Sequence, residues 1–121
     1  MRFVPTAAHG LADYVVGLIV VGLPFYFGWT GASRFTFVTL GVLVICYSLL
    51  TDYELGLVRA LRIRFHLLLD ALFGLAMLAT PMLLHLPNNY RIPVYVIGVL
   101  SLFLSLTTKI RAQGTRSEVT I

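Results

Sequence analysis

The fold is decided by a stretch near the N-terminus, which reads His9-Gly-Leu-Ala-Asp13-Tyr-Val-Val-Gly17-Leu-Ile-Val-Val-Gly-Leu-Pro24. A second stretch follows at an offset of 57 residues and reads His66-Leu-Leu-Leu-Asp70-Ala-Leu-Phe-Gly74-Leu-Ala-Met-Leu-Ala-Thr-Pro81. Histidine, aspartate, glycine and proline recur at this one offset without a gap. Leucine matches would be common by chance in so apolar a sequence, whereas matches among these rarer residues would not. We infer that the chain is a tandem duplication.

The duplication continues through the second half of each unit. The same offset aligns Arg34 with Arg91, Gly41 with Gly98, Ser48 with Ser105, and Thr51 with Thr108. We therefore expect repeat 1 to cover about 3–53 and repeat 2 about 60–110, followed by a polar tail over 111–121. Because 121 residues suffice for one domain only, both repeats belong to a single domain.

Composition indicates that this domain lies in a membrane. Apolar residues make up 59% of the chain and charged residues 12%, and the mean hydropathy is +0.92. A soluble domain is nearer half apolar and a quarter charged, and so short a chain must leave much of its surface exposed. The expected partner is the lipid bilayer. A nucleic-acid partner is not expected, because the nine Lys and Arg form no basic stripe with interleaved aromatic residues.

Four charge-free stretches are long enough to cross that bilayer. They cover 14–33, 35–51, 71–90 and 92–108, which are 20, 17, 20 and 17 residues. A helix needs about 20 residues to span the hydrocarbon core, with a lower limit near 17. Each repeat holds two spans, so both repeats start from the same side and are parallel. We expect an all-α membrane protein whose four transmembrane helices form a pseudo-twofold bundle.

The distribution of Lys and Arg predicts the orientation of the bundle, because these residues are enriched in cytoplasmic segments. One side carries seven of them: Arg2, Arg59, Arg62, Arg64, Lys109, Arg111 and Arg116. The other side carries Arg34 and Arg91. Both termini are therefore expected in the cytoplasm.

Several of these segments resemble a known family. The residues that carry the resemblance are His9-x3-Asp13-Tyr-x2-Gly17, Gly22-Leu-Pro-Phe-Tyr-Phe-Gly-Trp29 and Leu49-Leu-Thr-Asp-Tyr-Glu-Leu-Gly56, together with the second copy from His66 to Met82. From about 3 to 109 the chain resembles the bacterial SPW-repeat membrane proteins, whose biochemical function is not established. The Ser-Pro-Trp motif itself reads Leu23-Pro24-Phe25 and Thr80-Pro81-Met82 here, so only its proline is kept. The resemblance implies a small protein of the bacterial inner membrane.

The candidate site consists of His9 with Asp13 and His66 with Asp70. Residues four apart share a helix face, so each histidine can bond to the aspartate of its own helix. Ionisable side chains inside a span are costly and usually face the protein interior. If the first and third helices meet at the pseudo-twofold axis, all four side chains converge.

Small residues and prolines surround this site in the sequence. Gly17 and Gly74 continue the His/Asp face and would let a neighbouring helix approach closely. Gly41 and Gly98 would offer close-packing surfaces on the second and fourth helices, within the bundle or in a homo-oligomer. A proline inside a helix frees a carbonyl and bends the helix, which we expect at Pro24 and Pro81.

Three interpretations of the His/Asp residues remain open. The leading one is structural: the side chains fix helix packing and give the protein a structural or interaction role in the membrane. A second is a metal or haem site with His9, Asp13, His66 and Asp70 as ligands. A third is proton or ion translocation through the two pairs. No catalytic residues are expected, since neither a nucleophile motif nor a phosphate-binding loop is present.

Overall fold

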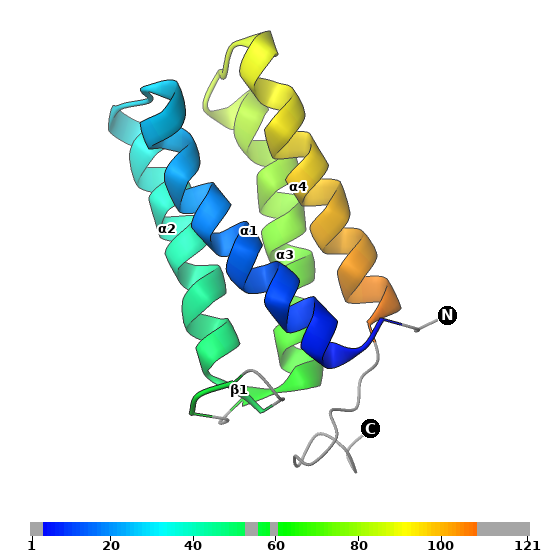
Figure 1. Ribbon diagram of the computed structural model, residues 1–121. Coiled ribbons are helices and arrows are strands. Elements are labelled where there is room, and N and C mark those ends of the chain that lie inside the picture. The colour runs from blue at the N-terminus through cyan, green and yellow to red at the C-terminus, as the bar shows by residue number, and fades with distance from the viewer. Residues whose placement is uncertain (1–3, 53–55, 59–60, 109–121) are drawn as a thin grey trace.

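The prediction of an all-α membrane protein is confirmed by a computed structural model, which describes residues 4–52, 56–58 and 61–108 (Figure 1). The predicted tail over 111–121 and the outermost residues of both repeats lie outside this part of the chain. The described elements are α1 (Thr6–Phe27), α2 (Gly31–Leu49), β1 (Thr51–Asp52), β2 (Leu61–Arg62), α3 (Ile63–Leu83) and α4 (Asn88–Thr107). All four helices are long and apolar enough to cross a membrane.

The helices form two hairpins that stand side by side. α1 packs along α2 and α3 along α4, whereas far fewer contacts run between the hairpins. In Figure 1 the α1–α2 and α3–α4 turns lie together at one end, and the start of α1 and the end of α4 lie at the other end with β1. The two repeats therefore run in the same direction, as parallel repeats should.

Helices α1 and α3 are displaced from the charge-free stretches toward the N-terminus. They begin at Thr6 and Ile63 rather than at 14 and 71. The charge-free criterion excluded Asp13 and Asp70, but both carboxylates are buried inside the helices. An ionisable residue can lie within a span when it has a polar partner in the bundle, and both aspartates have one.

The C-terminal ends of α1 and α3 also come before the ends of the charge-free stretches at 33 and 90. α1 ends at Phe27, and the next residue, Gly28, has a left-handed φ of 73° and donates its N–H to the carbonyl of Pro24. The equivalent residue in repeat 2 is His85, with φ of 53°. Pro24 and Pro81 thus lie near the ends of their helices, where both are buried.

Glycine lets the two helices of each hairpin touch through their backbones. A Cβ atom on Gly41 would lie 2.7 Å from the carbonyl oxygen of Gly17. In the other hairpin, a Cβ on Gly98 would lie 3.0 Å from the carbonyl oxygen of Gly74. The four glycines therefore pack inside the hairpins, in the manner of small residues in membrane helix pairs.

Apolar side chains fill the bundle and also cover its outside. The interior includes Val20, Phe37 and Met77, each fully buried. Near the hairpin turns, aromatic rings join the two hairpins, with the Phe27 and Tyr90 centroids 4.8 Å apart. Large apolar side chains remain exposed on all four helices. Such a surface is rare on a soluble monomer and suits a lipid environment.

Candidate functional site

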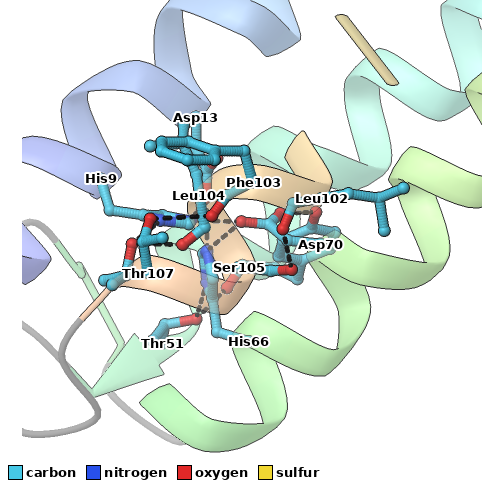
Figure 2. Close-up of polar contacts among 12 residues, drawn as sticks. His9, Asp13, Thr51, His66, Asp70, Leu102, Phe103, Leu104, Ser105 and Thr107 are labelled. Carbon is cyan, nitrogen blue, oxygen red and sulfur yellow. Dashed lines mark hydrogen bonds and ion pairs between the residues drawn. The ribbon is translucent and has the colours of Figure 1, made fainter. Parts of the chain in front are cut away.

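The two His/Asp pairs converge at the end of the bundle opposite the hairpin turns. His9 and Asp13 extend from α1, and His66 and Asp70 extend from α3 toward the same point (Figure 2). Their relative exposures are 0%, 6%, 0% and 1%. One possible ligand atom from each residue lies within 4.8 Å of the other three. The structure thus brings all four candidate residues into one buried group, which we call the His/Asp cluster.

The shortest contacts in the His/Asp cluster cross between the hairpins. His66 Nε2 lies 2.5 Å from Asp13 Oδ2 but 3.4 Å from Asp70 Oδ2 on its own helix. His9 likewise hydrogen-bonds to Asp70, while its Nε2 lies 3.0 Å from Asp13. The sequence spacing had suggested bonding along each helix. Cross-pairing is closer because the four side chains point at one centre, so that each ring faces the carboxylate of the opposite helix.

The second ring nitrogen of each histidine bonds to a threonine hydroxyl at a helix end. His9 Nδ1 lies 2.6 Å from Thr108 Oγ1, and this hydroxyl donates to the carbonyl of Leu104 at 2.6 Å. A hydroxyl has a single hydrogen, so Thr108 must accept from the Nδ1–H of His9. The other half of the cluster repeats this arrangement. His66 Nδ1 lies 2.7 Å from Thr51 Oγ1, and this hydroxyl donates to the carbonyl of Tyr47 at 2.6 Å.

These bonds fix the number of protons in the cluster. Both Nδ1 atoms carry hydrogen, and each short Nε2–Oδ2 contact must also hold one proton, because two bare acceptors would repel each other. Two histidines, two carboxylates and these shared protons give a net charge of zero, wherever the shared protons lie between N and O. Charge-neutral pairing is what permits ionisable groups to be buried in an apolar interior.

Each histidine takes its closest carboxylate and its threonine partner from the other repeat. His9, in repeat 1, bonds to Asp70 and Thr108 of repeat 2. His66, in repeat 2, bonds to Asp13 and Thr51 of repeat 1. The backbone follows the same rule, since the Val4–Thr108 bridge is the repeat counterpart of the Leu61–Thr51 pairing between β2 and β1. One hairpin alone therefore lacks the closest partners of its histidine and keeps only the longer contact to the aspartate of the same helix.

Tyr47 makes the cluster asymmetric and was not among the residues predicted for the site. Its hydroxyl donates to Asp70 Oδ1, and its ring packs edge-on against His66 with centroids 5.0 Å apart. The equivalent position in repeat 2 is Leu104. The only sequence signal was this mismatch, one helical turn before Thr51.

Thr51 and Thr108 had appeared in the sequence only as a repeat match without a role. Ser48, also matched by the repeat, is fully buried, and its Oγ finds no hydrogen-bond partner among the described residues. Its counterpart Ser105 donates to the carbonyl of Leu102 at 2.9 Å. The glycines and prolines singled out with the site lie outside the His/Asp cluster and shape the hairpins instead.

The donor set suits a small cation better than haem. The centroids of the two imidazole rings are 5.4 Å apart, and carboxylate oxygens occupy the space between their Nε2 atoms. A porphyrin bound to either Nε2 would have to displace both carboxylates. Two imidazoles and two carboxylates, in contrast, are common ligands of Zn²⁺ and related ions.

Comparison with known proteins identifies no relative. No protein-family model matches the sequence, no curated protein is similar to it, and no solved structure matches the fold. The function must therefore be inferred from the bundle and its His/Asp cluster.

Proposed function

We propose that this chain is a small structural protein of the bacterial inner membrane, in which the His/Asp cluster locks two hairpins into one rigid unit. The observation that carries the proposal is the exchange of partners between repeats: every hydrogen bond described above for His9 and His66 joins one repeat to the other. A lock of this kind would present fixed helix faces to neighbouring membrane proteins.

The need for such a lock follows from the solvent. Lipid tails are as apolar as leucine, so little hydrophobic force holds helices together in a bilayer. The backbones of the two hairpins also make few contacts with each other. Five described side-chain hydrogen bonds cross between the hairpins in the cluster. At an average near 0.6 kcal/mol for such bonds in membranes, they contribute about 3 kcal/mol.

The resemblance to the SPW-repeat proteins supports the bacterial assignment, and we propose that the chain is a divergent member of that family. The seven-to-two distribution of Lys and Arg supports cytoplasmic termini. A phosphatase that is active only outside the cytoplasm, fused after Lys109, should therefore stay inactive. An active fusion would reverse the orientation without affecting the cluster.

The lock is tested by the stability of full-length variants in detergent after treatment with a chelator. His9→Ala should lower the free energy of unfolding by about 3 kcal/mol, because it leaves a buried charge without its partner. The matched control is Leu11→Ala on the same helix, where the side chain is 62% exposed and the change should be within about 0.5 kcal/mol. Equal effects of the two substitutions would contradict the proposal.

Translocation makes a different prediction in liposomes. A structural lock should leave a pH gradient as stable as it is in protein-free vesicles. A proton flux that disappears in the double variant Asp13→Asn with Asp70→Asn would favour translocation and overturn the purely structural role.

A further inference from the structure

We infer that the His/Asp cluster is also a binding site for one divalent transition-metal ion of the Zn²⁺ class. The ligands would be the Nε2 atoms of His9 and His66 and one carboxylate oxygen each from Asp13 and Asp70. This inference goes beyond the structural role and does not depend on it, because the lock is defined for the metal-free chain.

The first support is the spacing of the four ligand atoms. A tetrahedral ion with ligands at about 2.0–2.1 Å holds those ligands roughly 3.3 Å apart. The separations in the cluster run from hydrogen-bond contact up to 4.8 Å and so bracket this value. Individual Nε2–Oδ2 distances include 2.5, 3.0 and 3.4 Å. Tetrahedral coordination would therefore lengthen the shortest of these contacts and shorten the longest.

The second support is the shell of residues behind the ligands. A histidine that binds metal usually donates its other ring N–H to a fixed acceptor, which sets its tautomer and orientation. Thr108 and Thr51 are such acceptors here, and each is itself anchored to a helix carbonyl. With Nδ1 protonated, the lone pair available for a metal is on Nε2, which faces the cluster centre. The carboxylate of Asp70 is also held from behind, because the hydroxyl of Tyr47 donates to its second oxygen, Oδ1.

The third support is charge. Without metal, two shared protons balance the two carboxylates; when a divalent ion binds, these protons leave to solvent and the ion takes their place. The net charge is zero before and after, so the exchange adds no net charge to an apolar interior. A monovalent ion in the same exchange would leave the site negative, and a trivalent ion would leave it positive.

The ligand types narrow the choice among divalent ions. Ca²⁺ takes six to eight oxygen ligands, and Mg²⁺ takes a near-ideal octahedron that retains several waters. The cluster offers two nitrogens and two carboxylates in a buried site of small size. This set favours Zn²⁺ or Co²⁺ in tetrahedral coordination.

The experiment uses the full-length chain in detergent, stripped with a chelator and then titrated with Zn²⁺ or Co²⁺. We expect one ion per chain, about two protons released per ion in weak buffer, and the strong visible absorption of tetrahedral Co²⁺. Failure of the wild-type chain to retain stoichiometric Zn²⁺ would overturn the inference and would leave the lock untouched.

Variants then assign the ligands. Asp13→Asn should weaken Zn²⁺ binding at least about 100-fold, and Thr108→Val, behind His9, about 10- to 100-fold. The control is His85→Ala, since His85 is an exposed histidine in the α3–α4 turn and should be dispensable. Loss of binding in His85→Ala, or full binding by Asp13→Asn with Asp70→Asn, would place the ion elsewhere.

Discussion

The crossed pairing in the His/Asp cluster predicts a specific pattern of energetic coupling. His66 lies 2.5 Å from the carboxylate of Asp13 across the hairpins and 3.4 Å from that of Asp70 on its own helix. A double-mutant cycle compares the loss of stability in a double variant with the two single losses and so isolates the interaction of a pair. We therefore consider His66→Ala combined with either Asp13→Asn or Asp70→Asn.

These two distances give the expected difference between the two coupling energies. With an effective dielectric constant of about 20, opposite unit charges attract by about 6.6 kcal/mol at 2.5 Å and about 4.9 kcal/mol at 3.4 Å. Coupling between His66 and Asp13 should therefore exceed that between His66 and Asp70 by about 1–2 kcal/mol. By repeat symmetry, His9 should couple more strongly to Asp70 than to Asp13.

Free energies of unfolding can be measured by denaturing titration of chelator-treated protein in mixed micelles. Trp29 is the single tryptophan and is buried in the aromatic contact between the hairpins, so its fluorescence reports their separation. Leu68→Ala, on an exposed position of α3, should be additive with Asp13→Asn within about 0.5 kcal/mol. Stronger coupling along a helix than across the hairpins would refute the crossed pairing.

Two further predictions concern the hairpins. Gly41→Ala should lower the free energy of unfolding by about 1–3 kcal/mol, and by more than Gly17→Ala does. The reason is that a Cβ on Gly41 would meet backbone atoms at 2.7 and 2.8 Å, whereas a Cβ on Gly17 would chiefly meet the flexible side chain of Ile45. Thermal unfolding measures both variants, with Gly22→Ala, where space is open, as the neutral control. Gly28→Ala should lower the free energy of unfolding by about 1 kcal/mol through its left-handed backbone alone, since nothing lies within 4 Å of the added Cβ. At the equivalent position of repeat 2, His85→Gly should leave stability unchanged or raise it slightly. A Gly28→Ala variant as stable as the wild type would show that this turn can change its conformation freely.

The architecture could be predicted from the sequence because its signals are local or periodic. Long apolar runs specify membrane helices by length alone, and the offset between His9 and His66 establishes the duplication. Parallel orientation then follows from two spans per repeat. None of these inferences requires knowledge of which side chains meet in space.

The details of the site could not be predicted because they depend on tertiary contacts. The spacing of His66 and Asp70 is compatible with bonding along the helix, and only the arrangement of the two hairpins favours Asp13 instead. Tyr47 lies outside the repeat pattern, so symmetry gave no reason to choose it. The charge-free stretches begin only after Asp13 and Asp70, so they understate how far α1 and α3 extend toward the N-terminus, although the His/Asp pairing had already placed both aspartates on helices.

The central claim is that histidines and aspartates of opposite repeats meet inside the membrane. Solid-state NMR on bilayer-embedded, chelator-treated protein, labelled with ¹⁵N in histidine rings and ¹³C in aspartate carboxyls, measures this contact directly. We expect two of the three histidines to have Nε2 within about 4 Å of an aspartate carboxyl carbon, and these signals to disappear in Asp13→Asn with Asp70→Asn. Histidine rings that show no carboxyl carbon nearby in the wild-type bilayer sample would contradict the account.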